Sequence, residues 1–165
     1  MRGALAFLGA VVLLAAARSA HASHYDLSSI DLVAPAAVEV LSRLGIQTTE
    51  DLWKATRSAR DVSKLARKLK VPRATVQEWA EVCDLLRLDG VGPKMARVFR
   101  LAGVRRLRDL AREDPERLTA RIAEVNRREE ILGKLPDVNA VRGWVDEANA
   151  KAREPVRPGG RPKGP

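Results

Sequence analysis

The feature that most constrains this sequence is an internal repeat. Residues 30–52, IDLVAPAAVEVLSRLGIQTTEDL, align without a gap on residues 88–110, LDGVGPKMARVFRLAGVRRLRDL, at an offset of 58. A second pair of segments, VPRATVQEWAEV from Val71 and LPDVNAVRGWVDEA from Leu135, matches at an offset of 65. Because a repeat of this length usually forms one supersecondary unit that buries its apolar face on its neighbour, the chain is expected to fold as two related halves.

Both halves carry a helical pattern. Apolar residues recur at intervals of three and four, and alternating runs of β-branched residues are absent. The sequence therefore predicts an all-α fold of about eight short helices, divided into repeats at roughly residues 28–87 and 88–152. The change of offset from 58 to 65 predicts a longer middle helix in the second repeat.

The helix boundaries are marked by residues with known end preferences. Gly45 and Gly103 stand where a helix requires a left-handed residue after its last turn. Ser58 followed by Asp61 resembles a capping box. Asp114 precedes a proline and is expected to cap the next helix. Pro72 and Pro136 are also expected at the starts of helices.

The N-terminus has the three parts of a secretory signal peptide. Met1 and Arg2 are followed by an apolar segment over residues 4–17, too short for the roughly 20 residues of an ordinary membrane span. Ala20 and Ala22 then favour cleavage after residue 22. The alternative is an uncleaved anchor. Cleavage predicts an exported bacterial protein, periplasmic or extracellular. No later segment of the sequence is apolar enough to span a membrane.

The charge of the mature chain is moderate. Loss of the signal peptide, residues 1–22, lowers the net charge from +9 to +7. A basic Pro/Gly-rich tail over residues 153–165 is expected to be disordered and contributes +3. Residues 23–27 form a short segment before the domain at 28–152, and His24 in that segment is expected to be poorly ordered.

The second repeat contains a glycine turn that could hold an anion. Gly90 and Gly92 flank Val91, which is expected to anchor the turn in the core. Free amides at the start of the following helix favour a phosphate, and Lys94 and Arg97 lie just beyond them. These five residues are the candidate contacts with a nucleic-acid backbone. Four more arginines precede residue 111: Arg100, Arg105, Arg106 and Arg108.

The first repeat has lost these features. Leu32, Val33 and Ala34 replace the glycine turn, and Arg43 is the basic residue nearby. Side chains at these positions would block the close approach of a phosphate. The first turn is therefore expected to be structural, and the second turn either binds phosphate or only packs two helices together.

Three further residues are assigned to packing. Trp79 and Trp144 are related by the repeat and are expected to fill equivalent gaps in the core. Cys83 is the single cysteine, so no internal disulfide can form. Its helical spacing from Trp79 predicts a small buried side chain. The alternative is an intermolecular disulfide.

Residues from about 28 to 151 resemble an uncharacterised bacterial family, domain of unknown function four-three-three-two. The segments that carry the resemblance are IQTTEDL, WAEVCDLLRLDGVGPKMARVFRLAGV, VN at residues 125–126, LP at residues 135–136, and VRGWVDEA. The resemblance implies a tandem helix-hairpin-helix fold and no established activity. A more distant likeness, at the level of fold only, is to exported competence DNA receptors.

The inventory of reactive residues does not favour an enzyme. His21 leaves with the signal peptide, so one histidine and one cysteine remain, too few for a zinc site. Neither a Ser-His-Asp arrangement nor a phosphate-binding P-loop is present. We expect a non-enzymatic, exported binding or scaffold module that acts through protein–protein contacts, without a cofactor, metal or small-molecule substrate. The alternative is sequence-independent binding of a nucleic-acid backbone by the second hairpin.

Overall fold

The computed structural model describes residues 24–153, and all regular secondary structure in that range is helical. This confirms the prediction of an all-α fold with eight helices. The predicted signal peptide and residues 154–165 of the predicted tail lie outside the described residues. The helices are α1 (Pro35–Arg43), α2 (Thr49–Ala55), α3 (Ala59–Leu69), α4 (Arg73–Leu85), α5 (Pro93–Leu101), α6 (Leu107–Leu110), α7 (Pro115–Glu129) and α8 (Val138–Ala152).

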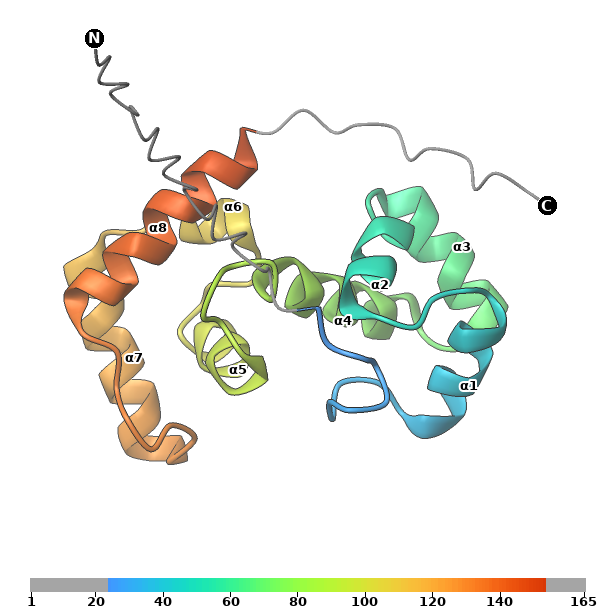
Figure 1. The fold of residues 1–165 in the computed structure, drawn as a ribbon, viewed down its shortest axis with the longest axis horizontal. Helices are drawn as coiled ribbons and strands as arrows, with labels where there is room; N and C mark the ends of the chain where they lie inside the picture. Colours follow the sequence, from blue (N-terminus) through green and yellow to red (C-terminus); the bar gives the residue numbers. More distant parts are fainter. Residues whose placement is uncertain (1–23, 154–165) are drawn as a thin grey trace, which may run out of the picture.

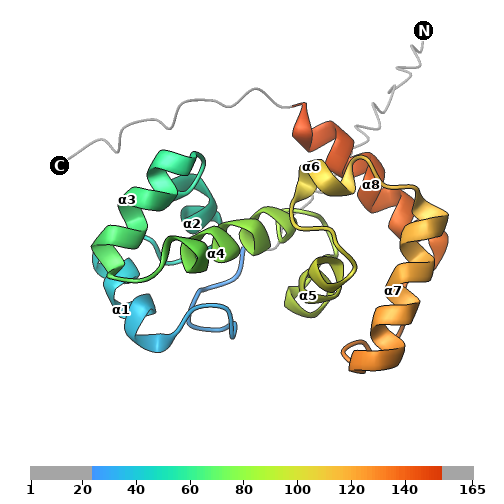
Figure 2. The ribbon, with the colours of Figure 1, turned by 180° about the vertical axis from the view of Figure 1, so that it is seen from behind.

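Helix α4 lies at the centre of the molecule. Helices α1–α3 pack on one side of it and α5–α8 on the other, in both the front and the back views (Figures 1 and 2). Two hydrophobic cores result, and α4 supplies both of them. Val76, Trp79 and Cys83 enter the first core. Leu85 and Leu86, on the last turn of α4 and just after it, enter the second. The two halves therefore share one helix.

The glycines after α1 and α5 end these helices in the same way. Gly45 has a φ of 75° and Gly103 a φ of 90°. The amides of Gly45 and Ile46 donate to carbonyls in the last turn of α1, and those of Gly103 and Val104 donate to the matching carbonyls of α5. This pair of bonds is the Schellman motif, as the repeat predicted.

The repeat is also visible where the next helix of each half begins. Asp51 accepts hydrogen bonds from the amides of the two residues before α2, at 3.2 and 3.0 Å. Asp109 accepts from the two residues before α6, at 3.2 and 3.1 Å. The hydrogen bonds thus recur at the sequence offset of 58.

The cap predictions are confirmed in part. The predicted capping box at Ser58 is half formed, because Asp61 accepts from the Ser58 hydroxyl rather than from its amide. Ser58 and Asp114 accept from backbone amides at the starts of α3 and α7. Pro72 is the N-cap of α4, whereas Asp137 rather than Pro136 caps α8.

The prediction of a longer middle helix in the second repeat is confirmed, because α7 has 15 residues against 11 for α3. The connection before the last helix is longer as well: it spans residues 130–137 before α8 and residues 70–72 before α4.

The segment before α1 is packed, contrary to the expectation for His24. His24 lies 3.3 Å from the carboxylate of Glu50. The amide of Leu27 donates to the carbonyl of Gln47, and the Leu27 side chain is fully buried in the first core. Tyr25 packs against the second core. Residues 24–27 therefore contact both hydrophobic cores. The packed fold begins before the predicted boundary at residue 28.

Cys83 and the two repeated tryptophans lie in or against the cores. Cys83 is buried, and burial raises the pKa of its thiol to about 12. It is therefore a packing residue and is not available for an intermolecular disulfide. Trp79 is buried in the first core, whereas Trp144 is only partly buried and meets Phe99 edge to face at 5.6 Å. Helices that could cross a membrane are not found in residues 24–153.

Candidate functional site

The two glycines of the second hairpin have different roles. Gly90 has a φ of +71°, which side chains strongly disfavour. Gly92 has a φ of −91°, a value open to any residue, so it needs no special backbone freedom. Val91 is fully buried and anchors the turn as expected. The conformation of the turn therefore depends on Gly90.

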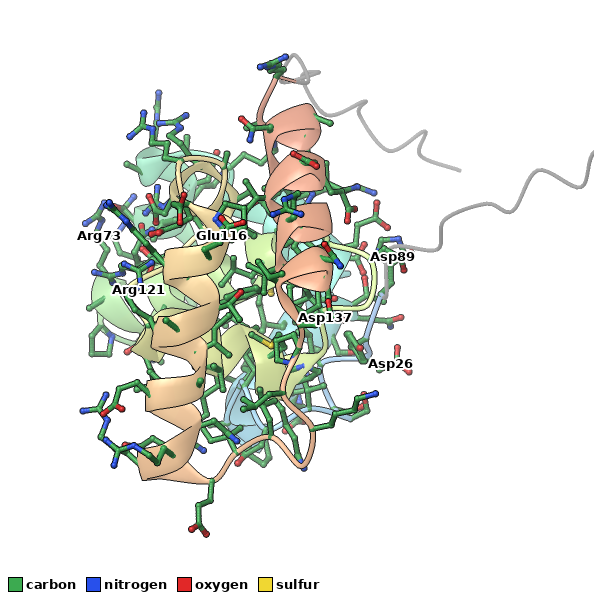
Figure 3. All side chains as sticks on the ribbon, turned by 90° about the vertical axis from the view of Figure 1, so that its left-hand side faces the viewer. Asp26, Arg73, Asp89, Glu116, Arg121 and Asp137 are labelled. Atoms are coloured by element: carbon green, nitrogen blue, oxygen red, sulfur yellow. The ribbon has the colours of Figure 1, made fainter. Side chains whose placement is uncertain are left out.

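The hairpin is already occupied by groups of the same chain. The amide of Asp89 donates to both carboxylate oxygens of Glu147, at 3.2 and 3.1 Å. The indole Nε1 of Trp144 donates to the carbonyl of Asp89 at 3.0 Å. Figure 3 shows Asp89 in the loop beside α8, the helix that carries both partners. An internal carboxylate therefore occupies the Asp89 amide, next to the turn where an external phosphate was predicted.

The basic residues after the turn divide into two groups. Lys94 and Arg97 are exposed and make no ion pair with any residue from 24 to 153. Arg100, Arg105 and Arg106 are paired with glutamates of α4. Lys94 and Arg97, the two cationic residues among the five candidate phosphate contacts, are therefore not paired with a carboxylate of the described chain.

The turn of the first repeat is built into the core. Val33 is buried, and Leu32 packs against both hydrophobic cores. Ala34 precedes α1 as its N-cap, without a side-chain hydrogen bond. This arrangement agrees with the structural role expected for that turn.

We expect Gly90→Ala to lower the free energy of unfolding by about 1–2 kcal/mol, because the left-handed conformation is strained for any residue with a Cβ. Gly92→Ala is the matched control. Its Cβ would lie 3.5 Å from the Tyr25 hydroxyl, an ordinary contact, so the change should stay within about 0.5 kcal/mol. Urea unfolding of both variants measures the difference. Equal losses would contradict the assignment.

A concave groove lies between the two halves of the fold. It has a volume of about 580 Å³ and is walled by α2, α4, α6 and the end of α8. Basic side chains outnumber acidic ones along it. The acidic residues are Glu81 and Asp84, and the basic ones are Arg57, Arg87, Arg106, Arg108 and Lys151.

Glu81 is a buried carboxylate in the wall of the groove. It accepts hydrogen bonds from Arg105 at 2.8 Å, Arg106 at 2.9 Å and Gln77 at 3.1 Å. Burial alone would raise the pKa of Glu81, but these hydrogen bonds and the guanidinium charges outweigh it and hold the pKa below its ordinary value. Glu81 is thus an ionised link between α4 and the start of α6.

Asp84, one turn further along α4, joins three parts of the fold. It accepts from the indole Nε1 of Trp53 at 3.1 Å and from the amide of Leu107 at 3.0 Å. It also pairs with Arg87 at 3.2 Å. Both carboxylates of the groove are therefore fully engaged in holding the halves together.

Trp53 is the aromatic residue of the groove. The guanidinium carbon of Arg57 lies 4.4 Å from the centre of its indole ring, and that of Arg87 lies 3.9 Å away. Both distances are typical of cation–π contacts. The sequence interpretation missed this cluster. The spacing of four residues between Trp53, near the end of α2, and Arg57, just after it, is the signal that could have found part of it.

The described residues contain no group of three or more histidine, cysteine, aspartate or glutamate side chains that could hold a metal ion. The reactive groups that the structure brings together are therefore the arginines and the indole of the groove, together with Lys94 and Arg97 at the hairpin. These side chains recognise anions by charge and hydrogen bonding.

Comparison with known proteins agrees with the resemblance seen in the sequence. The model of one protein family, described as "Domain of unknown function (DUF4332)", matches residues 32–151. No curated protein and no solved structure matches the chain. The matched segment includes all eight helices except the last residue of α8. The chain therefore belongs to the DUF4332 family.

Proposed function

We propose that this protein is an exported, non-enzymatic binding module that holds a segment of another protein in the groove between its two halves. The observation that carries the proposal is the groove itself, about 580 Å³ of concave surface lined by an indole and five basic side chains. Sites for ligand segments are generally concave, with a few polar groups that fix orientation. The paired hairpins are consistent with a helix-hairpin-helix scaffold.

The state of the two carboxylates supports binding over catalysis. Glu81 and Asp84 each accept three or more hydrogen bonds from the protein. A general base must be able to reach a proton of the substrate. These carboxylates are instead used to fix the walls of the groove.

The three tryptophans of the sequence provide the test. Trp53 lines the groove, Trp144 bonds to the second hairpin, and Trp79 is buried as an internal reference. Peptides selected by the mature protein, residues 23–165, from a random display library would be titrated in an NMR experiment that resolves the indole N–H signals. We expect the Trp53 signal to move while that of Trp144 stays constant. Selection of no peptide, or of peptides that leave Trp53 unchanged, would overturn the proposal.

The second candidate function is binding of a nucleic-acid backbone at the second hairpin. Its specific support is that Lys94 and Arg97 are free cations, whereas the matching positions of the first repeat are Ala36 and Glu39. The Glu147 carboxylate at the Asp89 amide weighs against it.

A DNA duplex titrated in the same experiment tests this candidate. Binding at the hairpin should move the Trp144 signal, and contact with about four phosphates should give a log–log salt slope near −3 to −4. Lys94→Glu should weaken that binding. A duplex that leaves Trp144 unmoved at low salt excludes the hairpin as its site.

A further inference from the structure

We propose that the segment held in the groove is acidic, rich in aspartate or glutamate, and that Arg57 and Arg108 are the side chains that select it. This inference rests on the proposed function and adds the chemical class of the partner. It starts from the unequal state of the charged groups along the groove.

The acidic side chains of the groove are already neutralised by the protein. Arg105 and Arg106 pair with Glu81, and Arg87 pairs with Asp84. Lys151 lies 3.4 Å from Glu147. Two of the lining cations, Arg57 and Arg108, make no ion pair with any described residue. The groove therefore presents positive charge that only an external anion can balance, and concave surfaces concentrate such a field.

The Arg57 guanidinium is held in place for a planar anion. It lies over the indole of Trp53 at 4.4 Å, and the Trp53 ring is fixed by its hydrogen bond to Asp84. Stacking uses the face of a guanidinium and leaves its N–H groups at the edge for hydrogen bonding. A carboxylate matches that edge with two parallel hydrogen bonds. Preorganisation of this kind lowers the entropic cost of binding.

The same stack argues against a nucleic acid as the partner. Sequence-independent binding of single strands depends on aromatic rings on which bases can stack. The Trp53 ring already carries two guanidinium groups, from Arg57 and Arg87, at 4.4 and 3.9 Å from its centre. Carboxylate side chains bind to guanidinium groups directly and do not require an accessible aromatic ring. The chemistry of the groove therefore favours a polypeptide with carboxylates.

The test uses a fluorescently labelled hexaglutamate peptide and the mature protein at pH 7 and low salt. We expect binding that moves the Trp53 indole signal and weakens with added salt. Arg57→Gln combined with Arg108→Gln should reduce the affinity about tenfold or more, because charge-assisted hydrogen bonds are lost. Hexaglutamine and an oligothymidylate of equal charge are the ligand controls, and both should bind at least tenfold more weakly.

Lys94→Gln combined with Arg97→Gln is the matched protein control. It removes the same charge from two exposed, unpaired cations outside the groove. The affinity for hexaglutamate should change less than twofold. Equal losses in the two double variants would show unspecific attraction and overturn the inference, as would equal binding of the oligothymidylate. If neutral peptides from the display library move Trp53 and hexaglutamate does not, the acidic partner is wrong while the proposed function stands.

Discussion

Phe99→Ala should lower the free energy of unfolding by about 3–5 kcal/mol, the range for removal of a large aromatic side chain from a core. Phe99 is fully buried in the second core and meets Trp144 edge to face. Domains of this kind are stable by only about 5–15 kcal/mol, so the loss takes a large share of the total. The melting temperature should fall by about 15 °C.

The effect should reach the first half as well. Helix α4 contributes side chains to both cores, and Leu32 packs against both of them. The second core therefore cannot open without withdrawing support from the first. In urea, the indole N–H signal of Trp79 in the NMR spectrum and the helical circular dichroism of the whole chain should report a single shared transition, shifted in the variant.

Leu101→Ala is the matched control, because Leu101 lies on the same helix and is 48% exposed. Its effect should stay within about 0.5 kcal/mol. Leu41→Ala, at the position related to Phe99 by the repeat, should cost about 2–5 kcal/mol from the other core. If Phe99→Ala shifted the signal of Trp144 and left that of Trp79 unchanged, the halves would unfold separately and the shared role of α4 would be wrong.

The repeat in the sequence was sufficient to predict much of the fold, because the repeated residues act locally. Gly45 and Gly103 end helices through bonds within one turn, and Asp51 and Asp109 bond to the residues just before them. Interactions of this range are encoded by short spacings, which sequence reading detects well.

The candidate site depends on contacts that no local spacing reveals. Glu147 reaches Asp89 across 58 residues, and Asp84 reaches Trp53 across 31. Such contacts are fixed by how α8 and α2 pack in the folded chain. Neither of these two contacts could therefore be predicted from the sequence around the glycine turn. For the same reason, the sequence does not show that Arg105 and Arg106 both pair with Glu81.

Glu81→Gln should lower the free energy of unfolding by about 2 kcal/mol at pH 7. An uncharged amide at this position cannot balance Arg105 and Arg106, and its NH₂ group would face one of their N–H donors. Breaking a fully buried ion pair costs about 3–5 kcal/mol. The two arginine side chains are 60% and 44% exposed and can regain water, so the loss should be smaller.

The loss should also depend on pH in a defined direction. The pKa of Glu81 in the folded protein lies below its ordinary value of 4.5, since the hydrogen bonds and charges from the arginines outweigh burial. Its contribution to stability is therefore fully present above pH 4.5 and disappears as the pH falls through the lower folded value. Urea midpoints of the wild type and Glu81→Gln should be well separated at pH 7 and converge as the pH falls below 4.5.

Glu116→Gln separates this effect from the general loss of a carboxylate. Glu116 also pairs with an arginine, Arg142, but both side chains are exposed, and such pairs contribute about 0–1 kcal/mol. Its unfolding midpoint should follow that of the wild type at every pH. If Glu81→Gln behaved like Glu116→Gln, the ionised link between α4 and α6 would not stabilise the fold. The wall of the groove would then have to be held by Asp84 and the shared cores alone.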